Sequence, residues 1–375
     1  MHEHRRYDLD WIRVIATLAV FFYHCSMFVN PFPWHIKNNE LNSTSILVFS
    51  LFLGLWIMPI FFAVSGISTF YALKQKQMKG YIKERFQRLA IPLIFGVFVL
   101  APPQVYIEKI YYHQFNDSFL RFIPRYFDGL YLEIGGAGNF AFFGLHLWFL
   151  LVLLVFSVLA LPLFVLLRKC SFKRLHFVLL PSLLVGTGFV KTQNLGGWDL
   201  LFYLVLFLYG YYFILSDDFR RALQSQIKIY FILAVSLTIV YVIWFLKGSL
   251  VTNSAQGIIF HGIQTLSSWS WLLVIFSLAN KYLSFSNRFL TYGSEASMPF
   301  YVLHQPVIVF YGFLIYDLTW PTTIKILFLL TVSFITIMVT YHFLIRNVAV
   351  LRVVFGLKKK RPIGESTTPK MVTLS

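Results

Sequence analysis

The sequence predicts an all-α, polytopic membrane protein with about ten transmembrane helices and both termini in the cytoplasm. The composition gives the first reason, because 58% of the 375 residues are hydrophobic and only 13% are charged, whereas soluble domains carry about 25% charged residues. The arrangement of the apolar residues in long blocks, and the distribution of Lys and Arg between these blocks, give the second and third.

Ten apolar runs have the length that a helix needs to cross a bilayer. They lie at 9–29, 45–73, 89–107, 142–167, 175–191, 198–215, 228–246, 255–279, 293–316 and 322–345. The run at 175–191 is weak because it is short, and the run at 255–279 because it contains many Ser, Gly and Gln residues. We therefore expect one transmembrane domain over residues 1–357, followed at 358–375 by a polar cytoplasmic tail with a composition typical of disorder.

The Lys and Arg residues give the predicted helices a direction. The N-terminus and the segments after every second helix hold 24 of the 32 Lys and Arg residues, whereas the segments on the opposite side hold seven. Basic loops stay in the cytoplasm, so both termini are expected there. The net charge of +17 follows from these loops, and no nucleic-acid partner is expected, since that would require a basic soluble face.

The first run contains Arg13 and His24, ionisable residues of a kind that lipid disfavours. Eleven positions correspond to three helical turns plus about 20°, so the two side chains share one face, roughly 16 Å apart along the axis. This stripe has an anion-binding group at the cytoplasmic end and a candidate general base in the outer half. A snorkelling anchor is the simpler explanation for Arg13 taken alone, and a neutral histidine bonded to a neighbouring helix explains His24 as well as catalysis does.

Two short motifs follow the first run. Ser65 and Gly66, near the end of the second run, either allow close approach of another helix or form a narrow, backbone-lined site beside the first helix. Arg85 and Arg88 are one helical turn apart at the cytoplasmic surface, and such a pair can grip phosphate oxygens. Membrane topology and contact with anionic lipids explain the two arginines without any site.

Polar and aromatic residues also occur near the predicted outer face. Trp34 and His35 come just after the first run, in a segment of the kind that meets sugars, although a solvated loop fits the composition equally. In the fourth run, His146 is placed to bond a lipid headgroup or a substrate, and Trp148 fits an interfacial aromatic belt without any function.

The ninth run contains His304 and Gln305 between Pro299 and Pro306, and these prolines are expected to interrupt the helix. Such a polar pair is costly in mid-membrane unless it lines a cavity. A bond from His304 to a kinked backbone is the alternative explanation.

Taken in chain order, five motifs resemble those of the membrane-bound acyltransferase-3 family. They are Leu-Asp-x-x-Arg with Arg-x10-His (Arg13, His24), Phe-Phe-x-x-Ser-Gly (Phe61 to Gly66), Arg-x-x-Arg-x-x-x-Pro (Arg85, Arg88, Pro92), Leu-Trp-Phe-Leu (Leu147 to Leu150) and Tyr-x-Leu-His-Gln-Pro (Tyr301 to Pro306). Three stretches, from Trp34 to Ile36, from Arg85 to Pro92 and from His146 to Leu153, are similar to the glucan-modifying branch, whose members succinylate periplasmic glucans.

The resemblance implies an integral membrane O-acyltransferase, with acyl-CoA as a cytoplasmic donor substrate, no tightly bound cofactor, no metal, and the hydroxyl of an extracytoplasmic glycan or glucan as acceptor. The acyl group, acetyl or succinyl, stays open. The implied donor-binding residues are Arg13, Ser65, Gly66, Arg85 and Arg88. The implied substrate contacts are Trp34, His35, His146, Trp148 and His304. The implied location is a bacterial plasma (cell inner) membrane.

In this interpretation the coenzyme A phosphates rest near Arg13, and the pantetheine arm rises along the stripe to bring its thioester to His24. His24 then acts as general base for the sugar hydroxyl or accepts the acyl group itself. Asp10, one turn before Arg13, is placed to hold the guanidinium. The competing function is a multipass transporter or exporter of a glycan or an acylated small molecule, which paired discontinuous helices would favour.

Overall fold

The protein is described by a computed structural model over residues 5–40, 44–128, 145–166, 175–190, 194–195, 198–214, 216–248 and 254–358. The regular elements of these residues are helices, apart from one antiparallel pair of two-residue strands, β1 (Asn194–Leu195) and β2 (Trp198–Asp199). The predicted all-α class is confirmed. The predicted tail at 358–375 lies outside the described residues except for Lys358, so its disorder stays a prediction.

Within the described residues, seven helices are long and apolar enough to cross a membrane, at Tyr7–Ser26, Thr44–Gln75, Met78–Tyr111, Asp217–Leu246, Ala255–Tyr282, Arg288–Ile315 and Thr322–Ile345. Three shorter apolar helices, Leu145–Leu159, His176–Phe189 and Leu200–Tyr212, correspond to the other three predicted runs. A multipass membrane protein is therefore confirmed, while the count of ten spans and the location of the termini stay predictions. The weak run at 255–279 forms a helix of 28 residues, and the run at 175–191 is short, as its sequence indicates.

The elements are named in chain order, and brief 3₁₀- or π-helical segments carry the symbol η. The first elements are α1 (Tyr7–Ser26), α2 (Thr44–Gln75), α3 (Met78–Arg85), η1 (Phe86–Ala90), α4 (Ile91–Phe95), η2 (Gly96–Leu100), α5 (Ala101–Tyr111), α6 (Phe119–Asp128), η4 (Leu145–Leu147), α7 (Trp148–Leu159), α8 (Leu161–Leu166) and α9 (His176–Gly186). The later ones are η5 (Thr187–Phe189), α10 (Leu200–Tyr212), α11 (Asp217–Leu246), α12 (Ala255–Tyr282), α13 (Arg288–Ile315), α14 (Thr322–Val339), η6 (Thr340–Ile345) and α15 (Ala349–Val354).

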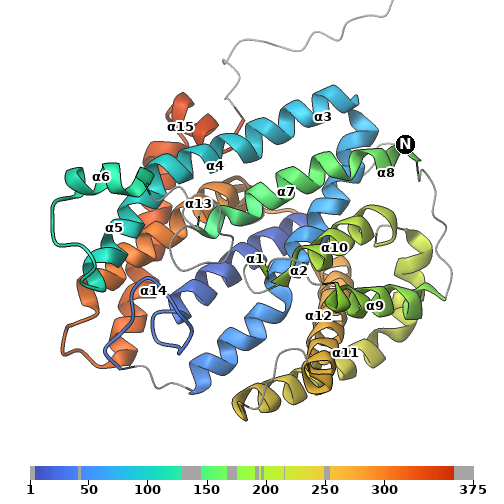
Figure 1. The fold of residues 1–375 in the computed structure, drawn as a ribbon. Helices are drawn as coiled ribbons and strands as arrows, with labels where there is room; N and C mark the ends of the chain where they lie inside the picture. Colours follow the sequence, from blue (N-terminus) through green and yellow to red (C-terminus); the bar gives the residue numbers. More distant parts are fainter. Residues whose placement is uncertain are drawn as a thin grey trace, which may run out of the picture.

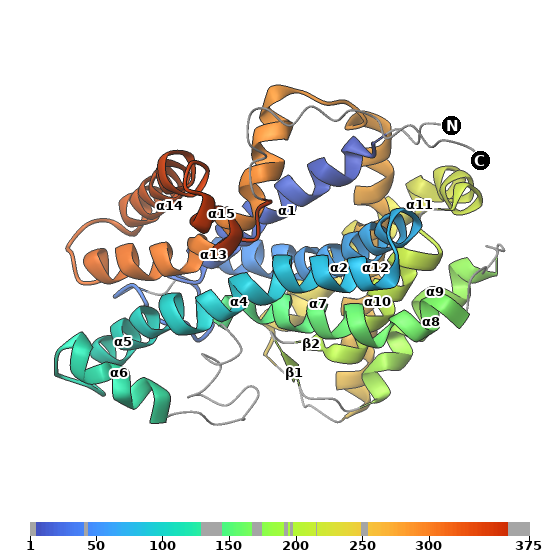
Figure 2. The same cartoon turned by 90° about the horizontal axis from the view of Figure 1, so that it is seen from above.

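Helices α1 and α2 form the centre of the molecule (Figure 1). Helix α1 contacts α2, α12, α13 and α14, and α2 also contacts α10 and α12. Helices α13 and α14 lie on one side of this central pair and α9 to α12 on the other, while α3, α4 and α5 run as one long rod beside α7 (Figure 2). Residues of α1 are therefore surrounded by other helices, which is where polar side chains inside a membrane protein can find partners.

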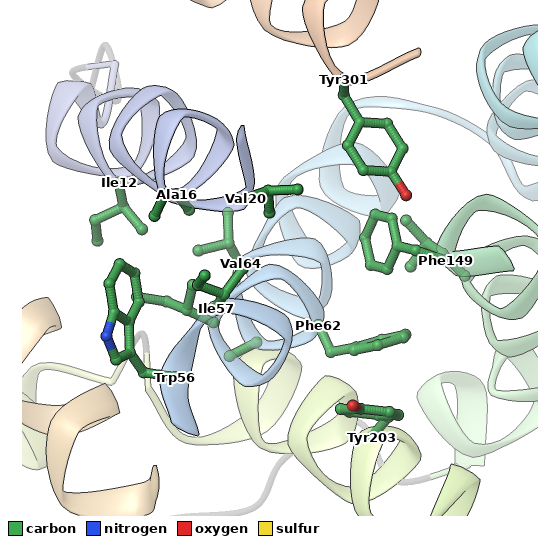
Figure 3. Close-up of a cluster of buried hydrophobic side chains, with 14 of the residues drawn as sticks. Ile12, Ala16, Val20, Trp56, Ile57, Phe62, Val64, Phe149, Tyr203 and Tyr301 are labelled. Atoms are coloured by element: carbon green, nitrogen blue, oxygen red, sulfur yellow. The ribbon is translucent and has the colours of Figure 1, made fainter. Parts of the chain in front are cut away.

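An apolar face of α1 fixes the rotation of this helix. Ile12, Ala16 and Val20 recur every four residues, are each less than 5% exposed, and face α2 (Figure 3). A stripe with this spacing lies on one side of a helix, and Arg13 and His24 come about 70° further around it. Burial of the apolar stripe thus directs both ionisable side chains along a second, adjacent face.

Helix α13 is continuous through both of its prolines. The prediction that Pro299 and Pro306 interrupt the ninth helix was wrong, because α13 runs unbroken from Arg288 to Ile315. A proline inside a helix leaves the carbonyl four residues earlier without its usual N–H donor, which for Pro306 is the carbonyl of Val302. The ring Nε2–H of His146 donates to that carbonyl at 3.1 Å, so the freed acceptor is satisfied and the helix continues.

Candidate active site

Three histidines from three separate segments meet beside the C-terminal half of α1. The ring of His304 in α13 lies 4.8 Å from that of His24 in α1 and 4.9 Å from that of His146 in η4. His24 Nδ1 and His304 Nε2 are 2.7 Å apart, a hydrogen-bond distance. His304 is 1% exposed and His146 6%. The structure thus joins three residues that the sequence predicts only as separate candidates, and we call them the histidine cluster.

The loop after α1 covers this cluster. Trp34 stacks on the ring of His24, with centroids 5.1 Å apart and planes at 21°. The next residue, His35, pairs through Nδ1 with the carboxylate of Glu108, and its Nε2 accepts a hydrogen bond of 3.0 Å from the Gln305 amide. The predicted Trp34 and His35 pair therefore lies against the site, and the neighbours His304 and Gln305 each hold one histidine of the α1 region.

The covering loop is also tied down at its far end. Lys37 donates to the carbonyl oxygens of Met27 and Asn30, the latter at 2.7 Å, and burial lowers the pKa of its ammonium to about 8. The Tyr112 hydroxyl donates to the Trp34 carbonyl at 2.9 Å. These bonds give the loop one defined position over His24.

Two site residues have no counterpart in the sequence analysis. Glu108 holds His35, and Gln104 accepts a hydrogen bond of 3.2 Å from the Gln305 amide. Both belong to α5, four residues apart, so they lie on one helical face. The sequence could have indicated both residues, because two polar residues four positions apart stand at the end of the predicted third helix.

Arg13 lies at the other end of the stripe, with polar partners on α1 and α2. Its guanidinium donates to the Asp10 carboxylate at 3.0 Å and to the Ser68 hydroxyl at 2.9 Å. Asp10 also pairs with Arg5, at 2.9 Å. The predicted contact between Asp10 and Arg13 is present, and Ser68, three residues after Ser65, is the residue of α2 that reaches the guanidinium.

Arg85 and Arg88 lie close enough to Arg13 for their positive charges to interact with it, and we call the three the arginine cluster. Arg85 donates to the Thr69 hydroxyl at 2.8 Å and covers the ring of Tyr81. Arg88 lies 3.7 Å from the carboxylate of Glu84, and its side chain is 51% exposed. The two arginines contact different partners, and the region between them and Arg13 carries a surplus of positive charge.

Gly66 lies at a close crossing of α2 and α10. A Cβ atom on Gly66 would come within 1.9 Å of the Phe207 carbonyl oxygen, and one on Gly210 within 2.0 Å of the Ala63 carbonyl oxygen. Only glycine permits these backbones to approach so closely. This supports the packing explanation for Gly66. The predicted donor-binding roles of Gly66 and of Ser65 stay predictions.

Trp148 belongs to the hydrophobic core. Its side chain is buried, with its ring 5.7 Å from that of Tyr203 and 6.4 Å from that of Phe62. Phe62 and Tyr203 stack on each other in the same group (Figure 3). The structure therefore brings His146, at the start of the same segment, to the histidine cluster and leaves Trp148 in the packing behind it.

The two clusters suit different chemistry. Neutral imidazoles exchange protons and act as nucleophiles, whereas neighbouring guanidinium groups bind phosphate oxygens. In the described part of the chain, no group of three or more His, Cys, Asp or Glu residues is arranged to hold a metal ion. The predicted absence of a metal stays a prediction.

Comparison with known proteins places this arrangement in a family. A family model described as an acyltransferase domain matches residues 6–342. The proteins named glucans biosynthesis protein C of Salmonella paratyphi B and Salmonella heidelberg are each 22% identical to this chain over 338 residues, which cover 82% of this chain and 83% of the relative. No solved structure matches the chain significantly. The chain belongs to the acyltransferase-3 family.

Proposed function

We propose that the protein is an integral membrane O-acyltransferase that moves an acetyl or succinyl group from cytoplasmic acyl-CoA to a hydroxyl of an extracytoplasmic glycan or glucan. Membership in the family supports an acyltransferase, and the names of the relatives favour a glucan as acceptor. The proposed location is the inner membrane of a bacterium, with the arginine cluster on the cytoplasmic side and the histidine cluster nearer the outer side.

The proposal rests on one observation, the separation of basic and histidine side chains along α1. One face of this helix has Arg13, with Arg85 and Arg88 beside it, at one end and His24, bonded to His304, near the other. The two ends are roughly 16 Å apart along the helix axis. This span suits the pantetheine arm of coenzyme A, so the phosphates can rest on the arginine cluster while the thioester reaches His24.

The reaction needs only proton transfer and displacement at the thioester carbon. In the direct route, His24 removes the proton of the acceptor hydroxyl, the oxygen forms a bond with the acyl carbon, the carbon–sulfur bond breaks, and His24 returns the proton to the thiolate. In the covalent route, His24 attacks the acyl carbon and the carbon–sulfur bond breaks, which releases the thiolate. The acceptor oxygen then bonds to the acyl carbon, the carbon–nitrogen bond breaks, and the hydroxyl proton passes to the thiolate. Both routes use one nitrogen of His24 with a free lone pair.

The experiment is a reconstituted assay with purified protein in liposomes, acetyl-CoA or succinyl-CoA, and a glucan acceptor. Release of the coenzyme A thiol measures turnover, and mass spectrometry of the glucan gives the acyl mass. We expect His24→Ala to lower turnover about 10²–10⁴-fold, the range of a general base, with insertion into the membrane unchanged. His342→Ala, at an exposed histidine near the other end of α13, is the matched control and should retain turnover.

Wild-type turnover in His24→Ala would overturn the role of His24. Movement of a glucan across the liposome membrane by wild-type protein, without release of coenzyme A, would favour the transporter instead. Mass spectrometry of surface and periplasmic glycans from cells with and without the gene then identifies the acceptor and the acyl group together.

A further inference from the structure

Helix α13 offers two consecutive backbone carbonyls to the histidine cluster. His304 Nδ1 lies 2.6 Å from the Tyr301 carbonyl oxygen, and His146 Nε2 lies 3.1 Å from the Val302 carbonyl oxygen. The Val302 carbonyl is free because Pro306 has no N–H to give it. A carbonyl oxygen only accepts hydrogen bonds, so each of these two ring nitrogens carries the hydrogen.

The hydrogen bond to the Val302 carbonyl determines the tautomer of His146. A neutral imidazole has one N–H and one lone pair, so Nδ1 of His146 holds the lone pair when Nε2 donates to Val302. That Nδ1 atom is buried and has no hydrogen-bond partner among the described residues. Leaving a buried acceptor unpaired costs about 1–3 kcal/mol, so this atom is suited to a donor that a ligand brings.

The tautomer of His24 follows from its hydrogen bond to His304. Since His304 Nδ1 donates to the Tyr301 carbonyl, its Nε2 has the lone pair and accepts from His24 Nδ1 across 2.7 Å. The lone pair of His24 is then on Nε2. The rings of His146 and His304 are buried, where a positive charge without a counterion is costly, and this favours neutral imidazoles.

We propose that α13 presets His24 and His146 in opposite tautomers, so that the site takes an acceptor with two hydroxyl donors. One hydroxyl donates to His24 Nε2 and is acylated, and the second donates to His146 Nδ1 and orients the acceptor. His304 is the positioning residue that sets the reactive nitrogen of His24, in the direct and the covalent route alike. The proposal rests on the proposed function for its substrate class, a polyol such as a sugar.

The tautomers themselves are tested without turnover. Nuclear magnetic resonance of protein with ¹⁵N-labelled histidine, assigned with the variants His24→Gln and His146→Gln, distinguishes a nitrogen that carries hydrogen from one that does not. We expect hydrogen on Nδ1 of His24 and on Nε2 of His146. The same tautomer in both residues would overturn the inference, even if the protein transfers acyl groups.

The role of His304 is tested with two amide variants. The terminal oxygen of Gln reaches the place of ring Nε2 and can still accept from His24, whereas the shorter Asn reaches only the place of Nδ1, beside the Tyr301 carbonyl. We expect His304→Gln to keep kcat within about tenfold of wild type and His304→Asn to lose about 10²–10⁴-fold. Equal losses in both variants, or better activity in the Asn variant, would contradict the positioning role.

The second hydroxyl is tested with methyl glucoside and its monodeoxy analogues as acceptors. Removing the hydroxyl that binds His146 should raise KM about 3–10-fold in the wild type, the size of one hydrogen bond, and should have no such effect in His146→Gln. The Gln variant keeps a donor for Val302 but lacks the Nδ1 lone pair. Equal penalties in both proteins for every analogue would overturn the second-hydroxyl site. Absence of transfer to any acceptor would instead overturn the proposed function, with the tautomers still open to the resonance measurement.

Discussion

The two ends of the α1 stripe differ in how their polar groups are satisfied. At the histidine cluster, His24 and His304 are bonded to each other and to the backbone, and Trp34 covers the ring of His24. At the arginine cluster, the Arg13 side chain is 40% exposed and the Arg88 side chain 51%. The rings of His24 and His304 are held in place before a substrate arrives, whereas the arginine cluster has like charges that remain in contact with water.

This difference agrees with the function proposed for each end of the α1 stripe. A reacting group must be oriented before reaction, because reorganisation at the moment of reaction raises the barrier. A site for a charged ligand instead benefits from uncompensated charge, which draws the ligand in and is relieved when the ligand binds. Order at the histidine end and positive potential at the arginine end are therefore separate properties, which separate variants can remove.

The largest effect after those at His24 and His304 is expected for Arg13→Gln. Loss of a hydrogen bond to a charged group costs about 1.5–3 kcal/mol, so KM for acyl-CoA should rise about 10–100-fold. With acyl-pantetheine, a donor without the nucleotide phosphates, the variant should match wild type, while His24→Ala should fail with both donors. Arg13→Lys, which keeps the charge but not the planar fork, should fall between.

Equal losses for Arg13→Gln with the two donors would contradict the division of the stripe into a phosphate end and a reacting end. Steady-state kinetics with each donor over a range of concentrations gives the comparison directly.

A smaller effect, on stability rather than kinetics, is expected for Gly66→Ala. The added Cβ meets the Phe207 carbonyl at 1.9 Å, so α2 and α10 must separate, and overpacking of this kind costs about 1–3 kcal/mol. The thermal midpoint in detergent should fall by several degrees, while KM for acyl-CoA should change little. Gly186→Ala, where nothing lies within 4 Å of the new atom, is the matched control.

A normal thermal midpoint with a raised KM for acyl-CoA in Gly66→Ala would assign Gly66 to the donor site rather than to packing. The variant therefore decides between the two explanations that the sequence leaves open for the Phe-Phe-x-x-Ser-Gly motif.

The sequence predicts those features that depend on local rules. Lipid requires long apolar helices, so hydropathy alone indicates a multipass protein, and helical periodicity alone puts Arg13 and His24 on one face. The apolar stripe of Ile12, Ala16 and Val20 in the structure is consistent with that rotation of α1. Both predictions use residues near in the chain, for which spacing is sufficient.

The contacts that form the histidine cluster join residues that are far apart in the chain. His24 and His304 are 280 positions apart, and His146 and Val302 are 156 apart, so no spacing rule relates them. The wrong prediction at Pro306 has the same origin, because a proline breaks a helix only if the freed carbonyl finds no other donor. That donor is His146, and its position next to α13 depends on how distant helices pack.

The smallest effect concerns Lys37, in the loop that closes the histidine end and has no counterpart at the arginine end. Burial lowers the pKa of Lys37 to about 8 in the folded protein, below the value of about 10.4 in an unfolded chain. Between these values the unfolded state binds more protons, so stability should rise with pH. Because Lys37 is partly exposed to water, we expect a gain of about 2 °C or less in the thermal midpoint relative to Lys37→Met as the pH increases from 7 to 10. Lys247→Met, at an exposed lysine, provides the control for general effects of pH. If the thermal midpoint of Lys37→Met responds to pH as that of wild type does, the charge on Lys37 does not affect the stability of the loop.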